Sequence, residues 1–217
     1  MITRQSVTLT PGANMIDILS RGGSLGMATR TSSRTTTMAE QQFEELLRRN
    51  RESLGAHQPP PLLKQLVGIP NLPGSLCILT CSDSRVDPTQ YLGLKIGEAF
   101  VLRNAGGRAV DALRSLQVIS SIHPINLIVV VHHTDCGGLF TNDEEVRDKM
   151  CARAPAHRDS IRDKSFGTFQ DIGIDESIRE DVAMLKKWAF RSPETQVVGY
   201  ALDIKTGKIR RVVGNNE

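Results

Sequence analysis

The stretch LCILTCSDSR, residues 76–85, passes from an apolar run into a thiol, a carboxylate and a guanidinium. Residues 76–80 have the length and composition of a strand that is buried on both faces, as in a parallel sheet. Cys81 follows directly, and in extended backbone alternate side chains point the same way. We therefore expect Cys81, Asp83 and Arg85 to share one side at the end of a buried strand.

The rest of the chain alternates between strand and helix patterns. Further buried strands are expected at residues 99–102 and 127–131, with a helix between them, and another helix is expected around residues 178–185. Residues 155–173 are polar and are expected to form a long loop. Residues 196–204 and 208–213 flank a Thr-Gly turn, which indicates strand–turn–strand. This order predicts an α/β fold: a mostly parallel β-sheet flanked by helices, with the C-terminal hairpin at its edge.

The first 38 residues differ in composition from the rest. They hold one acidic residue, Asp17, beside four arginines and thirteen Ser/Thr. This composition is typical of a disordered tail and also of a mitochondrial transit peptide. We expect residues 1–38 to be a tail or targeting segment and residues 39–217 to be one domain, starting with a helical arm. The expected location is the cytoplasm, or the mitochondrion if the segment is a transit peptide.

Composition argues against several classes of function. The 217-residue chain has 27 Lys and Arg against 24 Asp and Glu, which is no broad basic footprint for nucleic acid. The longest apolar stretch, residues 127–131, is far shorter than the roughly 20 residues that a membrane span needs. Four cysteines do not make a disulfide framework in a chain of this size. We expect neither nucleic acid nor membrane as a partner.

A second group of chemically active residues follows the strand at 127–131. His133 and Cys136 are three residues apart, close enough to bind one ion. Functional groups gather beyond the carboxyl ends of parallel strands, so Cys81 joins them if the two strands are neighbours. Two sulfurs and one nitrogen suit zinc.

The number of protein ligands decides what such a zinc does. A structural site is closed by four protein ligands, whereas a catalytic site keeps a position for water. Cys77 lies inside the strand and Cys151 in a polar segment without a partner motif. We expect both to be ordinary cysteines, which leaves the site open.

Asp83 and Arg85 are suited to assist a zinc-bound water. Two thiolates neutralise the ion formally, so its water is acidified less than a water that faces three neutral histidines. Asp83 can accept a hydrogen bond from zinc-bound hydroxide, and Arg85 can keep Asp83 ionised. A nucleophilic cysteine of the phosphatase kind is a rival, but the Cys-to-Arg spacing is short. A redox pair is disfavoured because no C-x-x-C motif occurs.

Together these motifs resemble those of the β-class carbonic anhydrases. CSDSRVDP at 81–88 resembles the family's first zinc motif, FVLRNAGG at 100–107 its second block and HTDCGG at 133–138 its third. The likeness covers about residues 40–213, with order and spacing kept. It implies one Zn²⁺ per chain and a catalytic dyad, with the ligands Cys81, His133 and Cys136 and the dyad Asp83 and Arg85.

The resemblance also implies an activity and an assembly. The activity is reversible hydration of CO₂ to bicarbonate by zinc-bound hydroxide, with substrate held beside Phe100, Ala105 and Gly106. The assembly is a homodimer or a dimer of dimers, in which a helix near residues 39–50 embraces the neighbour. His132 and His123 are expected to be structural.

Some positions depart from the family pattern. By ungapped counting, Leu72 and Val118 stand where plant members have a Gln and a Tyr, which predicts a more apolar and roomier pocket. Ile78 stands where bicarbonate-regulated members have a Trp, three residues before the first zinc cysteine. That difference favours an open site in which Asp83 does not bind the metal.

Two alternatives to CO₂ hydration stay open. RNAGGRA at 103–109, with the HHTDCG that follows at 132–137, is also similar to a branch that includes carbonyl sulfide hydrolases. CO₂, COS and CS₂ are linear, apolar molecules open to the same attack, so COS hydrolysis to H₂S and CO₂ is one alternative. A non-catalytic zinc-binding module is the other, and it predicts a fourth protein ligand.

Overall fold

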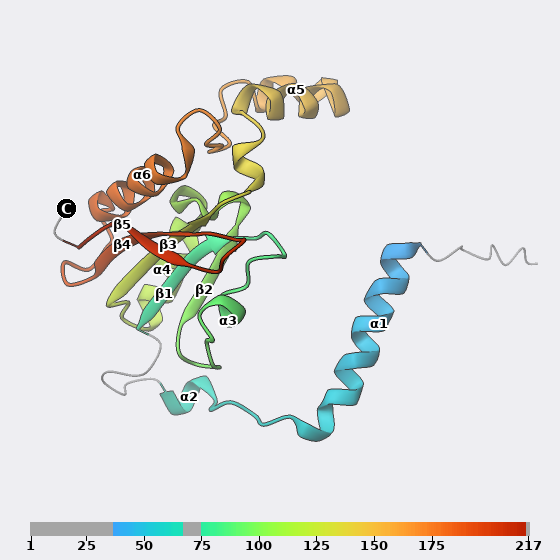
Figure 1. Cartoon of the computed structure of the whole chain (residues 1–217), viewed down its shortest axis with the longest axis vertical. Helices are drawn as coiled ribbons and strands as arrows, with labels where there is room; N and C mark the ends of the chain where they lie inside the picture. The colour runs from blue at the N-terminus through green and yellow to red at the C-terminus, as the bar shows by residue number, and fades with distance from the viewer. Residues whose placement is uncertain (1–36, 67–74, 216–217) are drawn as a thin grey trace, which may run out of the picture. The chain divides into compact units, whose positions relative to one another are not determined.

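The computed structural model describes residues 37–66 and 75–215 (Figure 1). The chain forms two compact units, Met1–His57 and Gln58–Glu217. Most of the expected tail, residues 1–36, lies outside the described residues, as does Leu72. The expectations for the tail and for Leu72 therefore stay predictions. No helix of the described ranges is long and apolar enough to cross a membrane.

The described part of the first unit is a helix, α1 (Met38–Ser53), followed by a short 3₁₀ turn, η1 (Leu54–Ala56). A capping box begins α1: the Thr37 hydroxyl accepts from the Glu40 amide at 3.2 Å, and the Glu40 carboxylate accepts from the Thr37 amide at 2.7 Å. The expected helical arm is therefore present. Its apolar side chains are exposed, Phe43 at 58% and Leu46 at 49%.

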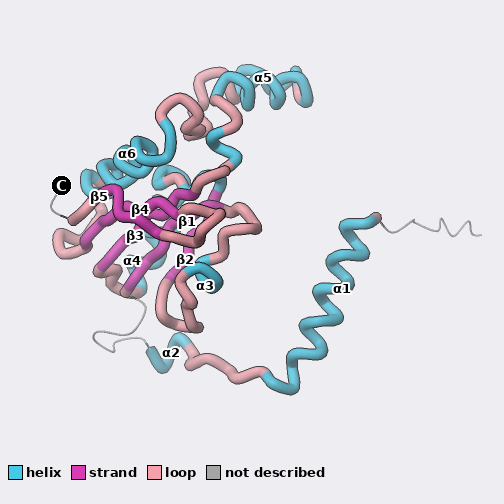
Figure 2. The backbone as a smooth tube through the Cα atoms, in the orientation of Figure 1, coloured by secondary structure: helices cyan, strands magenta, loops and turns pink. Residues whose placement is uncertain are grey.

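A five-stranded sheet organises the second unit (Figure 2). The strand order is β2-β1-β3-β4-β5; the first four strands are parallel, and β5 runs antiparallel to β4 at one edge. The predicted α/β fold with its C-terminal hairpin edge is confirmed. The strands are β1 (Leu76–Cys81), β2 (Phe100–Asn104), β3 (Leu127–His133), β4 (Gln196–Leu202) and β5 (Ile209–Val213).

Two long helices, α4 (Ala109–Ile122) and α6 (Gly173–Lys187), pack on one face of the sheet. Their apolar side chains meet alternate strand residues such as Leu79 and Val130, which makes the larger part of the core. At Gly199 of β4, an added Cβ would lie 2.3 Å from Cγ2 of Ile178 on α6. This close approach of helix and strand fixes the position of α6.

The opposite face carries a smaller cluster. Ile78 and Val131, which point away from the larger core, pack with Val86 and with side chains of the segment that follows it. That segment contains the short helix α3 (Pro88–Tyr91), whose first turn Asp87 caps through the Thr89 amide.

Helix α5 (Asp143–Arg153) is not predicted by the sequence pattern, because its residues are mostly charged and form no apolar stripe. Its signal is at its start, where the Asn142 side chain accepts from the Glu145 amide and three acids occupy the first turn. The expected loop at 155–173 contains one 3₁₀ helix, η4 (Pro155–Ser160). The other short elements are α2 (Leu63–Leu66), η2 (Ala105–Gly107) and η3 (Gly137–Leu139).

Candidate metal centre

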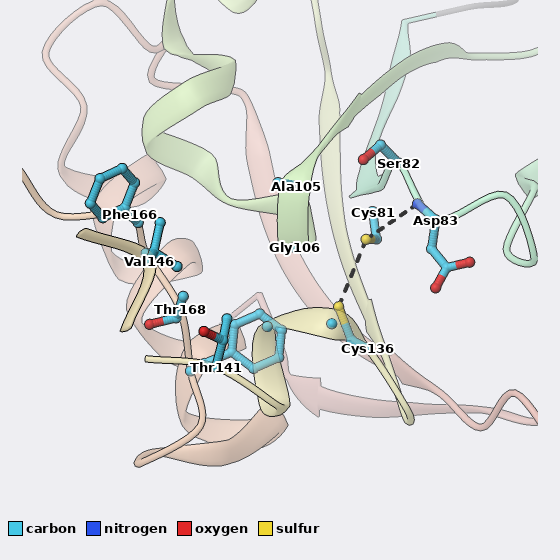
Figure 3. Close-up of a pocket in the computed structure, with 14 residues that line it drawn as sticks. Cys81, Ser82, Asp83, Ala105, Gly106, Cys136, Thr141, Val146, Phe166 and Thr168 are labelled. Atoms are coloured by element: carbon cyan, nitrogen blue, oxygen red, sulfur yellow. Dashed lines mark hydrogen bonds between the residues drawn. The ribbon is translucent and has the colours of Figure 1, made fainter. Parts of the chain in front are cut away.

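The topology brings three candidate ligands together. Strands β1 and β3 pair in parallel, so Cys81 and His133, the last residues of these strands, lie at the same edge of the sheet. Cys136 follows in the loop after β3. One ligand atom of each residue lies within 4.8 Å of the other two, and all three residues are buried. The two sulfurs are 3.8 Å apart (Figure 3).

The imidazole of His133 is oriented by its own strand end. Its Nδ1 lies 2.8 Å from the carbonyl of Thr134, which can only accept, so Nδ1 donates and Nε2 keeps its lone pair. Nε2 is buried and has no hydrogen-bond partner in the described chain. A buried lone pair beside two sulfurs fits a metal ligand held by an outer hydrogen bond.

The two sulfurs are electrostatically coupled. A hydrogen bond from the Cys136 thiol lowers the pKa of Cys81, and the amides of Asp83 and Gly106 act in the same direction against burial. The hydrogen bond of its thiol with Cys81, together with burial, raises the pKa of Cys136. A proton is therefore shared in the contact between the two sulfurs. A divalent ion would displace that proton, so the donor set fits zinc.

Arg85 holds Asp83 in a two-pronged pair, with Nε 3.0 Å from Oδ1 and Nη2 2.7 Å from Oδ2. The guanidinium keeps the pKa of Asp83 well below its usual range. Asp83 is therefore ionised next to the sulfurs, and its amide approaches Cys81 Sγ at 3.4 Å. The pairing that the sequence predicted is present.

Asp135 is a site residue that the sequence analysis missed. Arg85 donates through Nη1 to its carboxylate at 2.7 Å and through Nη2 to its carbonyl at 2.9 Å. Its φ of 57° lies in the left-handed region, which Asp tolerates better than most residues. This turn separates His133 from Cys136. An Asp between two closely spaced ligands was the available signal.

A cavity of about 440 Å³ opens beside the sulfurs. Ala105 and Gly106 line it, as expected for substrate-contacting residues, and so does Asp83. Phe100 does not line it; its ring lies 5.9 Å from that of His123 and packs on the larger core. Val118 is 46% exposed on α4 and is also not part of the lining.

The far wall of the cavity comes from the segment after η4 and from α5 (Figure 3). Asp143, the first residue of α5, accepts four hydrogen bonds from Ser165, Phe166 and Thr168 at 2.7–3.2 Å. Burial opposes ionisation of this carboxyl, but the donors prevail and its pKa is about 2. These hydrogen bonds to Asp143 fix Phe166 and Thr168 in the cavity wall.

Comparisons with known proteins agree with this geometry. Residues 76–209 match the family model described as carbonic anhydrase. The chain is 32% identical over 168 residues to a carbon disulfide hydrolase of Acidianus sp. (strain A1-3), covering 69% of this chain and 82% of that protein. It is 32% identical over 142 residues to β-carbonic anhydrase 1 of Mycobacterium tuberculosis, covering 63% and 81%.

A solved structure of carbonic anhydrase from Streptococcus mutans superposes with a TM-score of 0.66 at 33% identity, covering 78% of this chain and 96% of that one. The fold and the site thus define a family of enzymes. The chain belongs to the β-class carbonic anhydrase family, as its motifs predicted.

Metal binding gives the first prediction. We expect one zinc per purified chain by elemental analysis, and we expect Cys136→Ser to lose it because serine replaces a thiolate ligand. Cys151→Ser, which changes a buried cysteine of α5 outside the cluster, should keep the zinc. Affinity should fall as pH falls, because protons compete for the sulfurs. Full zinc occupancy in Cys136→Ser would show that the assignment is wrong.

Proposed function

We propose that the protein catalyses the reversible hydration of CO₂ to bicarbonate with one zinc per chain. The observation that carries this proposal is the open ligand set. Among the residues that the structure describes, no fourth Cys, His, Asp or Glu joins Cys81, His133 and Cys136. An open set favours a catalytic site over a closed structural one, which argues against the non-catalytic module.

When bound, zinc supplies a Lewis acid that makes water a nucleophile near neutral pH. Asp83 then has a defined task. Its carboxylate, kept ionised by Arg85, accepts a hydrogen bond from the attacking oxygen and aims the lone pair at carbon. Arg85 also ties Asp83 to the loop that carries Cys136. One guanidinium therefore positions both Asp83 and the loop that carries Cys136.

The cavity supplies the other requirement, a largely apolar space for an apolar substrate. Ala105 and Gly106 border it on the side of β2, and Val146, Phe166 and Phe169 give it an apolar wall. Excluding water from this space strengthens the electrostatic effect of Asp83 on the reacting oxygen. Bicarbonate, once formed, leaves in exchange for water.

Replacing Asp83 tests this arrangement. In Asp83→Asn the amide can donate to the reacting oxygen and misdirect its lone pair. We expect zinc content to stay unchanged and kcat/KM for CO₂ hydration, measured by stopped flow, to fall about 100-fold or more. Asp203→Asn, in the turn between β4 and β5, is the matched control and should retain full activity. A normal rate in Asp83→Asn would remove the orienting role.

Hydrolysis of COS to H₂S and CO₂ is the second candidate function. Two observations favour it: the cavity wall is apolar, and an Acidianus relative at 32% identity is a carbon disulfide hydrolase. The same attack on carbon would break a C–S bond, and the sulfur would leave as sulfide. The candidate metal ligands and Asp83 can act on either CO₂ or COS. The apolar wall of the cavity therefore decides which substrate is preferred.

One preparation should be assayed with both substrates. We expect measurable CO₂ hydration together with COS hydrolysis, with kcat/KM higher for CO₂. Sulfide release no faster than in buffer would eliminate the second candidate. Rapid sulfide release beside negligible CO₂ hydration would reverse the order of the two functions.

The proposal includes a homodimer, or a dimer of such dimers. The exposed Phe43 and Leu46 of α1 support it, because an apolar helix face is stabilised when a second chain covers it. Phe100 remains a proposed substrate contact within such an assembly, since it does not reach the cavity of its own chain.

A further inference from the structure

A buried polar cluster lies beside the cavity wall, outside the ligand set. Asp181 of α6 and His132 of β3 have side chains that are 1% and 0% exposed, and Arg108 is 8% exposed. Oδ2 of Asp181 lies 3.1 Å from His132 Nε2 and 3.4 Å from Arg108 Nε. Neither approach has hydrogen-bond geometry, so both carboxylate oxygens are buried without such a partner in the described chain.

Such a cluster is a poor way to gain stability. Burying a carboxylate costs free energy unless hydrogen bonds and an opposite charge compensate for it. Here Arg108 supplies the opposite charge, and Arg108 also pairs with Glu180 at 2.9 Å. A buried carboxyl group without a hydrogen-bond partner calls for a role other than stability.

The cluster holds the ring of Phe169. This ring stacks on the imidazole of His132 with centroids 5.4 Å apart and planes 14° apart, and the Arg108 guanidinium carbon lies 6.0 Å from its centroid. Phe169 is 1% exposed and lines the cavity. Because α6, β3 and the start of α4 supply the cluster, the ring is fixed by the core of the domain.

The same ring presses on two glycines of the site. A Cβ added to Gly138 would lie 2.6 Å from Cε1 of Phe169, and one added to Gly106 would lie 3.0 Å from the same atom. The Phe169 amide also donates to the Gly138 carbonyl at 2.9 Å. There is no space between the ring and these two backbones.

Both glycines face the sulfurs. The Gly106 amide lies where it lowers the pKa of Cys81, the Gly138 amide lies where it lowers the pKa of Cys136, and both glycines line the cavity together with the two cysteines. Outer hydrogen bonds of this kind orient metal ligands and tune the charge that they give to the ion. The position of one aromatic ring therefore controls one amide donor at each sulfur.

We propose that Phe169 is a positioning residue of the metal centre: the Arg108–Asp181–His132 cluster holds its ring, and the ring holds the Gly106 and Gly138 amides against the two sulfurs. The inference rests on one part of the proposed function, namely that the site binds a metal ion. It does not depend on which substrate reacts there.

The test reads the metal centre without turnover. Phe169→Leu keeps an apolar side chain but removes the ring, and we expect zinc affinity by chelator competition to fall about 10- to 100-fold. The sulfur-to-cobalt charge-transfer band of the Co²⁺-substituted protein should shift. Phe166→Leu alters the same cavity wall away from the cluster, so its cobalt spectrum should match that of the unaltered protein.

Asp181→Asn tests the cluster itself and decides the question alone if Phe169→Leu does not fold. Arg108 keeps Glu180 as a partner in this variant, and we expect the same shift of the cobalt band with a smaller loss of affinity. Asp175→Asn is the matched control on α6, because Asp175 pairs with the exposed Arg210. Asp175→Asn should leave the spectrum unchanged.

A double variant tests whether Gly138 and Phe169 act together. Gly138→Ala should weaken zinc binding by pushing its loop off the ring, and adding Phe169→Leu should restore part of that loss. Zinc affinity and cobalt spectra of Phe169→Leu and Asp181→Asn equal to those of Asp175→Asn would overturn the proposal. If the variants show these spectral shifts but the unaltered protein is inactive toward CO₂ and COS, only the proposed function is contradicted.

Discussion

The parallel pairing of β1 with β3 is the contact on which the site depends. Its register sets Thr80 opposite Val131, so Cys81 and His133 reach the same edge of the sheet together. Successive strand residues face opposite sides, so His133 points to the two cysteine sulfurs while His132 points to α6. A slip of one residue would exchange the two histidines and destroy both the ligand set and the buried cluster.

Electrostatic interactions hold the side chains that the strand register brings to this edge of the sheet. The two sulfurs lie 3.8 Å apart and shift each other's pKa in opposite directions, and Arg85 offsets the nearby carboxylates of Asp83 and Asp135. Cys81 and Asp83 belong to the end of β1 and the loop after it, whereas Asp135 and Cys136 belong to the loop after β3, and the Arg85 guanidinium joins the two segments. This arrangement gives the chain a cation site beside an ionised, oriented carboxylate.

Local patterns were enough to predict the strands and the grouping of Cys81, His133 and Cys136. Short apolar runs predict the buried strands. Parallel topology then predicts that candidate ligands lie at the strand ends, as Cys81 and His133 do. Asp143, by contrast, acts through hydrogen bonds to residues more than twenty positions away. No periodicity marks such a contact, and α5 lacks the apolar stripe that would have revealed its helix.

The cluster behind Phe169 escaped prediction for the same reason. Arg108, His132 and Asp181 come from separate elements, and each alone resembles an ordinary polar residue. His132 was expected to be structural, and its contacts with Phe169 and Asp181 give that expectation a physical content. Phe100 shows a different limit of the sequence prediction. The resemblance names Phe100 as a substrate contact, but it does not say whether the same chain brings this residue to the cavity.

The most direct test is a crystal structure of the zinc-loaded protein with anomalous diffraction recorded at the zinc edge. The account predicts one zinc per chain, with sulfurs of Cys81 and Cys136 at about 2.3 Å and the His133 nitrogen at about 2.0–2.1 Å. A solvent molecule should occupy the fourth position, and Asp83 should remain on Arg85. Zinc at another place, or a fourth protein ligand closing the site, would contradict the account.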